Sequence, residues 1–95
     1  MNHWSEIAEQ LRQQIEQRHQ AREAGLQACR KATQLCARAI RSLHRHEFET
    51  CRDLLTEAHR EIISAREQLR PFPSIYYAGF LHDAEKEYVE GETLY

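Results

Sequence analysis

The stretch 29-CRKATQLCARAIRSLHRHEF-48 contains both the periodicity and the interruption that decide the fold. Its apolar residues recur every three or four positions, as side chains on one face of an α-helix do. They are Cys29, Ala32, Cys36, Ala39, Ile40 and Leu43. Because most of these side chains are small, a neighbouring helix can approach this face closely. The period breaks at 44-HRHE-47, which predicts a short turn before a second helix.

The same period extends toward the N-terminus. Trp4, Ile7, Leu11 and Ile15 follow each other at steps of three and four, and within residues 2–45 only Gly25 interrupts the pattern. A glycine inside a helix costs about 1 kcal/mol relative to alanine, which a well-packed helix tolerates. We therefore expect either one very long helix or two helices with a weak point at Gly25.

Toward the C-terminus the pattern predicts two further helices. The second begins at Phe48 and ends before 71-PFP-73, because Pro71 disfavours helical geometry at the preceding residue and lacks an N–H donor. Ser74 is a candidate N-cap for a third helix from Ile75. One face of that helix is expected to carry Tyr77, Leu81, Ala84, Tyr88 and Tyr95. The prediction is an all-α bundle of three long helices with antiparallel neighbours, in one domain over residues 1–95.

Composition supports this fold class and narrows the function. Charged residues make up 29% of the chain and aromatic residues 8%, with three glycines and two prolines, which excludes a β-sandwich and a disordered chain. Three cysteines without a C-x-x-C pair disfavour a disulfide framework and a zinc site, so we expect reduced, buried thiols in a cytoplasmic protein. No segment has the features of a signal peptide or a membrane span. A chain this short buries only roughly 60–65% of its unfolded surface, so we expect self-association.

Charge is distributed unevenly along the chain. Residues 1–45 carry eight Arg and Lys against four Glu, whereas residues 46–95 carry five against eleven acidic residues. No acid lies between Glu23 and Glu47, and the basic residues of this window fall on the side of the helix opposite the apolar stripe. Such a face fits a solvated surface or a ridge that attracts phosphate oxygens. The candidate nucleic-acid contacts are Lys31, Arg38, Arg41, His44 and Arg45.

The acidic segment 79-GFLHDAEKEYVEG-91 carries the second candidate site. Asp83, Glu87 and Glu90 stand at i, i+4 and i+7, so they fall within about 60° on one face of a helix. Three like charges in a row weaken a helix unless something compensates them. Carboxylate oxygens suit Mg²⁺ or Mn²⁺, so a divalent cation is one compensation, and solvation or pairing with arginine is the other.

Two segments resemble the translin/TRAX family, especially its archaeal and bacterial members. They are 40-IRSLHRHEFETCRDLLTEA-58, similar to the family's A-I-R-x-L-H-R-G-E/D-F-E turn, and 76-YYAGFLHDAEKEYVEG-91, similar to its Y-Y-A-G-F-x-x-D-A-x-Q-E-Y-x-E-A helix. The stretch 19-HQAREAGLQACRKATQLCARAI-40 is similar to the family's long first helix. The resemblance implies a seven-helix all-α fold, of which this chain covers the first half. It also implies binding of single-stranded RNA or DNA, and assembly with further copies or with a related subunit.

Members of the TRAX branch of this family are Mg²⁺-dependent endoribonucleases, so the resemblance further implies this activity. The two carboxylates of the E-Y-x-E motif match Glu87 and Glu90, which become candidate catalytic residues and metal ligands, with Asp83 as an additional candidate ligand. The family's third catalytic acid, an Asp further downstream, has no counterpart here. The chain also carries His46 where the turn motif has Gly, and Gly91 where the helix motif has Ala. Three functions follow: a nucleic-acid-binding module, a nuclease completed by an acid from elsewhere, or a purely structural chain.

Overall fold

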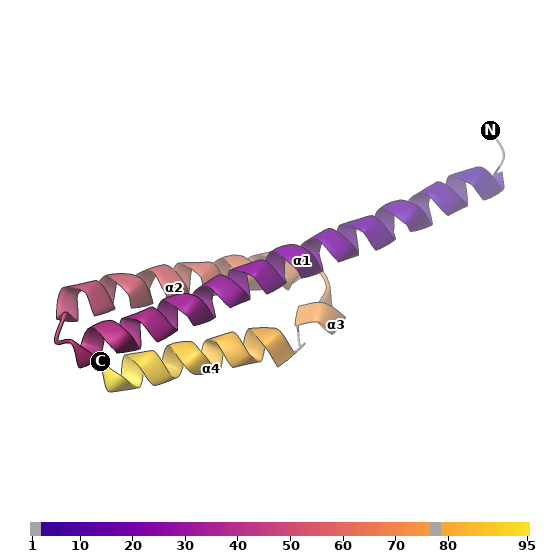
Figure 1. Ribbon diagram of the computed structural model, residues 1–95. Coiled ribbons are helices and arrows are strands. Elements are labelled where there is room, and N and C mark those ends of the chain that lie inside the picture. Colours follow the sequence, from indigo (N-terminus) through magenta and orange to yellow (C-terminus); the bar gives the residue numbers. More distant parts are fainter. Residues whose placement is uncertain (1–2, 77–78) are drawn as a thin grey trace.

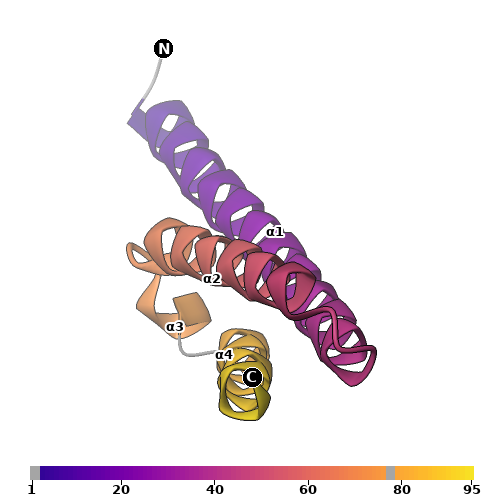
Figure 2. The same cartoon turned by 90° about the vertical axis from the view of Figure 1, so that its left-hand side faces the viewer.

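The computed structural model describes residues 3–76 and 79–95, which form four helices and no strand. Helix α1 spans His3–His44, α2 spans Phe48–Leu69, α3 is a single turn at Pro73–Tyr76, and α4 spans Gly79–Leu94. Helix α2 packs antiparallel to α1, and α4 runs along the same pair in the direction of α1 (Figure 1). Figure 2 shows α4 nearly end-on, beside the α1–α2 pair. The all-α prediction is confirmed.

Helix α1 continues through Gly25, so the first of the two expected arrangements is correct. Gly25 is buried where α1 meets the end of α2. A Cβ atom placed on it would lie 2.8–2.9 Å from three side-chain atoms of Leu69, which is itself fully buried. The glycine therefore permits a close approach of the two helices, and it is not a point of weakness.

The predicted turn between α1 and α2 is confirmed, and it contains the one positive φ among the described non-glycine residues. His46 has φ of 61°. Backbone hydrogen bonds close the turn, from the His46 N–H to the Leu43 carbonyl at 3.0 Å and from the Glu47 N–H to the Ser42 carbonyl at 2.9 Å. The left-handed region is costly for any residue with a Cβ atom. His46 thus stands where the similar family motif carries glycine.

Where a single third helix from Ile75 was predicted, the described residues form two helices, α3 and α4, on either side of residues 77 and 78, which lie outside the described residues. Pro73 occupies the first position of α3, where its missing N–H costs nothing, and a separate helix begins at Gly79. Ser74 lies inside α3 and is not an N-cap; its hydroxyl accepts a hydrogen bond of 2.7 Å from Arg18 of α1. Tyr77 lies outside the described residues. Of the other face residues, Leu81 and Ala84 are buried, Tyr88 is half-buried, and Tyr95 is exposed beyond the end of α4.

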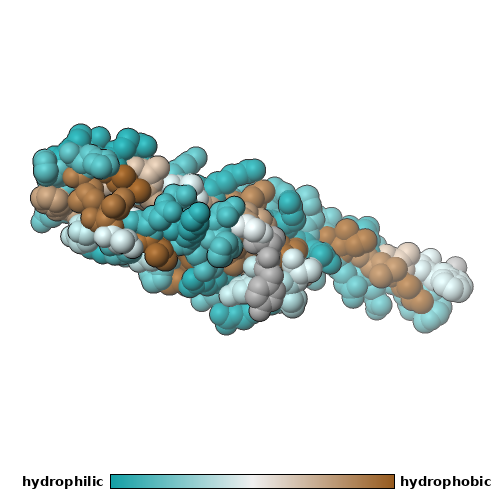
Figure 3. Space-filling view, turned by 90° about the horizontal axis from the view of Figure 1, so that it is seen from below, coloured by the Kyte–Doolittle hydropathy of each residue, from teal (hydrophilic) through white to brown (hydrophobic). Residues whose placement is uncertain are grey.

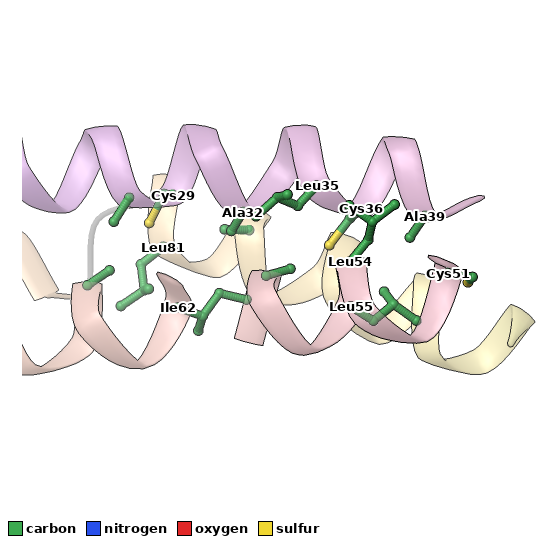
Figure 4. Packing of buried hydrophobic residues seen from close by; sticks show 14 residues of the cluster. Cys29, Ala32, Leu35, Cys36, Ala39, Cys51, Leu54, Leu55, Ile62 and Leu81 are labelled. Carbon is green, nitrogen blue, oxygen red and sulfur yellow. The ribbon is translucent and has the colours of Figure 1, made fainter. Parts of the chain in front are cut away.

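The hydrophobic core lies between α2 and the second half of α1, with α4 closing one side (Figure 4). Small α1 residues such as Ala32, Cys36 and Ala39 are fully buried, and Leu55 and Ile62 of α2 are 0% and 1% exposed. The same close packing recurs at Gly91 of α4, where a Cβ would meet a methyl group of Leu55 at 2.7 Å. All three cysteines are buried and free, as predicted.

The first half of α1 lies outside this core. Residues 3–20 extend beyond the ends of α2 and α4 (Figure 1), and every one of them is exposed except Ile7, which is half-buried. The molecule therefore measures 66 × 18 × 14 Å, with a radius of gyration of 17.8 Å against about 12 Å for a compact chain of this length. Trp4, Leu11 and Ile15 remain 77%, 54% and 69% exposed, and Figure 3 shows hydrophobic residues along this projecting end. No described helix is long and apolar enough to cross a membrane.

Candidate nucleic-acid and carboxylate site

The basic face of α1 separates into paired and unpaired residues. Lys31 Nζ lies 3.3 Å from a carboxylate oxygen of Glu61 on α2, and Arg45 pairs with Glu47 in the turn. Arg38, Arg41 and His44 are exposed and form no ion pair or hydrogen bond with the described part of the chain. Arg30, on the same face, is also exposed, and it likewise forms no ion pair or hydrogen bond with the described residues.

Position around α1 does not explain this difference, because Lys31 and Arg38 are seven residues apart and share one side of the helix. The difference is instead that Glu61 of α2 lies within reach of Lys31, whereas Arg38 and Arg41 have no acidic partner among the described residues. Lys31 is exposed and Glu61 is half-buried, and a solvent-accessible pair of this kind contributes at most about 1 kcal/mol, so little stability is lost if Lys31 contacts a phosphate instead. All five predicted contacts are thus accessible, and the unpaired Arg38 and Arg41 are the least committed to the fold.

The acids of α4 divide in the same way. Glu85 pairs with Arg66 of α2 at 3.3 Å. Glu92 accepts two hydrogen bonds from Arg52, at 2.5 and 3.0 Å, and a third from the Tyr88 hydroxyl at 2.9 Å. The hydrogen bonds from Arg52 hold the pKa of Glu92 below its ordinary value. Both carboxylates therefore attach α4 to α2.

Aromatic rings near Glu92 make further contacts between α4 and α2. The His59 ring stacks on Tyr88 with centroids 5.1 Å apart and planes 7° apart, and the Arg52 guanidinium lies 5.2 Å from the centre of the Tyr95 ring. Apolar spacing and charge did not predict this cluster. The available signal was the spacing of Arg52 and His59, which are seven residues apart and so share a face of α2.

Asp83, Glu87 and Glu90 are the acids of α4 that have no such partners. None of the three forms an ion pair or hydrogen bond with the residues that the structure describes. Asp83 and Glu90 are exposed, and Glu87 is half-buried on the side toward α1, close enough for its charge to act on the Cys36 thiol. Asp83 lines a groove between α1 and α4, whereas Glu87 and Glu90 do not line it.

The expected metal ligands do not converge in one copy of the chain. Across residues 3–76 and 79–95, no three His, Cys, Asp or Glu side chains lie close enough together to hold a metal ion. The donor chemistry of Glu87 and Glu90 suits Mg²⁺, which is usually held by one or two carboxylates together with water and substrate phosphates. Metal binding by these residues stays a prediction.

The groove beside Asp83 lies between α1 and the first turn of α4 and has a volume of about 350 Å³. Leu26, Cys29 and Phe80 provide apolar surface, and the polar lining residues are Arg30, Thr33, Gln34 and Asp83. The sequence placed Arg30 and Asp83 on two separate helical stripes. It did not predict that the parallel alignment of α1 and α4 would bring both residues to one groove.

The cysteines near the groove are unsuited to nucleophilic chemistry. Burial raises the pKa of Cys29 to about 11, with a smaller contribution from the charge of Glu85. Burial likewise raises the pKa of Cys36 to about 11, assisted by Glu87 and Glu92. The thiolate is the reactive form of cysteine, and its population at neutral pH is negligible for such groups. These thiols serve packing.

Comparison with known proteins assigns no function to this site, so its function is inferred from the residues that form it. No protein-family model matches the chain, and neither a curated protein nor a solved structure is significantly similar to it.

Proposed function

We propose that this protein binds single-stranded nucleic acid through the outer face of α1 and associates with further copies of itself. The observation that carries the proposal is the pair of exposed, unpaired guanidinium groups of Arg38 and Arg41. They lie on a helix that carries no acid between Glu23 and its end. Phosphate oxygens are the natural partners of such groups, because a guanidinium offers several donors and always carries charge.

Because the protein is acidic overall, nucleic-acid binding depends on where its arginines lie. The net charge is −2, so the molecule as a whole repels a phosphate backbone, and binding depends on a local positive surface. The carboxylates of Glu85 and Glu92 are neutralised by Arg66 and Arg52, which reduces the negative potential of α4. The resemblance of residues 40–58 and 76–91 to the translin/TRAX motifs favours the same ligand.

Self-association is supported by the projecting half of α1. Trp4, Leu11 and Ile15 form an apolar stripe that no described part of the chain covers. Exposed apolar residues at helical spacing are typical of a surface that packs against another helix. A second copy is one partner, and a related subunit is the other that the family resemblance implies.

A Mg²⁺-dependent endoribonuclease is the second candidate function. The observation that favours it is that Asp83, Glu87 and Glu90 form no ion pair or hydrogen bond with the described residues, whereas Glu85 and Glu92 of the same helix are paired. Since the third catalytic acid of the similar family has no counterpart in this chain, this candidate requires an acid from a second copy or a related subunit. We place it below the binding function for that reason.

The binding function is tested by measuring the affinity for single-stranded oligonucleotides as a function of salt. The double variant Arg38→Gln/Arg41→Gln should bind less tightly at low salt. The slope of log K against log salt should also become shallower by about 1.4, because each phosphate contact to a single strand contributes about 0.7.

The control variant Arg60→Gln/Arg70→Gln removes the same charge from exposed positions on α2 and just after it, and it should retain the slope. Equal slopes for the wild type and the Arg38/Arg41 variant would exclude this face. The same complexes, incubated with Mg²⁺ or Mn²⁺, discriminate the alternative. Cleavage that is abolished by Glu87→Gln or Glu90→Gln would establish the nuclease in place of the binding module.

A further inference from the structure

Two opposite charges, neither of them paired, stand at the edges of the apolar groove between α1 and α4. Arg30 comes from α1 and Asp83 from α4, and both line the groove together with the half-buried ring of Phe80. Neither side chain forms an ion pair or hydrogen bond within the described chain, although Lys31, Glu85 and Glu92 nearby in the sequence all do. Both charges are therefore available to a ligand.

The groove has the three features that a nucleotide requires. An aromatic ring offers a stacking surface, a carboxylate accepts hydrogen bonds from a base edge, and a guanidinium binds phosphate. The volume of about 350 Å³ lies within the range of small-molecule pockets. Thr33 and Gln34 add a hydroxyl and an amide to the polar lining.

We infer that this groove receives one unstacked base of the bound strand, with the base on Phe80, its edge on Asp83 and the adjoining phosphate on Arg30. The inference rests on the proposed nucleic-acid binding and adds to it a base-specific subsite. The groove lies on the α4 flank of α1, so a strand that follows Arg38 and Arg41 could place one nucleotide in it.

The chemistry of Asp83 determines which base the subsite prefers. An ionised carboxylate accepts hydrogen bonds and donates none. Guanine presents two parallel donors on its Watson–Crick edge, the N1–H and the N2 amino group, and both carboxylate oxygens can accept from them together. Adenine and cytosine each present one amino donor, and thymine and uracil present two carbonyl acceptors around one N–H. The expected order is guanine first and thymine or uracil last.

The test compares short oligothymidylates in which one central thymine is replaced by dG, dA or dC, with a metal chelator in the buffer. A single guanine cannot form a quadruplex, so each probe stays single-stranded. The wild type should bind the dG probe about five- to tenfold more tightly than the all-thymine probe, the magnitude expected of a bidentate base contact. Asp83→Asn should remove this preference, because an amide replaces one of the two acceptors with a donor.

Two further variants separate base contact from charge and from folding. Asp53→Asn removes an exposed acidic charge on α2 and should retain the guanine preference. Phe80→Leu keeps an apolar side chain at a residue that packs against the core but removes the aromatic ring, and it should weaken every probe about fivefold through lost stacking.

Three results would overturn the inference while the proposed function stands. They are equal binding of all four probes, a guanine preference that survives Asp83→Asn, and a preference that Asp53→Asn removes as fully as Asp83→Asn does. A preference that appears only when Mg²⁺ replaces the chelator would also overturn it and would assign Asp83 to a metal. Failure of every probe to bind would instead refute the proposed function itself.

Discussion

The two halves of α1 share one sequence pattern but have opposite surroundings. In residues 3–20 the apolar positions hold large side chains, and Trp4, Leu11 and Ile15 remain mostly exposed. In residues 25–44 the corresponding positions hold small side chains such as Cys29 and Ala32, which are buried beneath α2 and α4. An apolar period therefore predicts which face of a helix is available for packing, and the size of its residues indicates how closely a partner approaches. Whether a partner is present depends on the rest of the chain.

The sharpest test applies the same substitution to both halves. Leu35→Ala should lower the free energy of unfolding by about 2–5 kcal/mol, because Leu35 is 4% exposed and its truncation leaves a cavity in the core. Leu11→Ala should change it by less than about 0.5 kcal/mol at low protein concentration, because its side chain is already in solvent. Chemical denaturation followed by circular dichroism measures both.

The Leu11 variant has a second readout. If the projecting stripe binds another copy, Leu11→Ala should weaken self-association in sedimentation equilibrium and reduce the dependence of the melting temperature on protein concentration. A large loss of stability in dilute Leu11→Ala, comparable to that of Leu35→Ala, would contradict the contrast between the two halves.

The boundary between the halves is tested at Gly25. Alanine in an ordinary helix is more stable than glycine by about 1 kcal/mol. At Gly25 the added methyl group would lie 2.8–2.9 Å from the fully buried Leu69 side chain, so we expect Gly25→Ala to destabilise the protein by about 1–2 kcal/mol. Thermal melts of Gly25→Ala and of Gly79→Ala, where a Cβ meets nothing within 4 Å, provide the comparison. A stabilised Gly25→Ala would show that the packing at the boundary is loose.

The smallest effect concerns two carboxylates that each pair with an arginine. Glu92 accepts hydrogen bonds from Arg52 across α4 and α2, whereas Glu9 pairs with Arg12 along the projecting half of α1. Hydrogen bonds from these arginines lower the pKa of both acids. Glu92→Gln should cost at most about 1 kcal/mol at neutral pH, since both side chains are about one-third exposed and solvent screens the pair. Glu9→Gln should leave the stability of the core unchanged.

The sign of the pH dependence follows from the lowered pKa of Glu92. The folded protein holds this carboxyl ionised to lower pH than the unfolded chain does, so its contribution is present above the ordinary value of 4.5 and is lost as the pH falls through the lower folded value. The difference between wild type and Glu92→Gln should therefore disappear in acid. A difference that persists unchanged below the folded pKa would assign the effect to packing.

Most of the fold was predictable because it depends on local patterns. The period from Trp4 to Leu43 predicted α1, and 71-PFP-73 predicted the end of α2. The division of the third helix was not predictable from apolar spacing, which continues across Ile75 and Leu81 without a break. The close helix contact at Gly25 was also not predictable, because it is made with Leu69, forty-four residues away in the chain.

The candidate site was predictable in composition but not in pairing. Helical spacing grouped Asp83 with Glu87 and Glu90, and separated them from Glu85 and Glu92. That separation matches the division into unpaired and paired acids. The arginines that neutralise Glu85 and Glu92 come from α2, and only the tertiary arrangement reveals which acids they reach. Likewise, the groove exists only because α4 runs alongside α1.

The position of Trp4 has a consequence for spectroscopy. It is the only tryptophan of the chain, and it stands at the tip of the projecting helix, 77% exposed and remote from the core. Its indole already emits from water in the folded state, so its emission wavelength should barely change when the bundle unfolds. A blue shift in that emission would instead report that another surface has covered the tip. The emission wavelength of Trp4 should therefore respond to assembly and hardly at all to unfolding of the bundle.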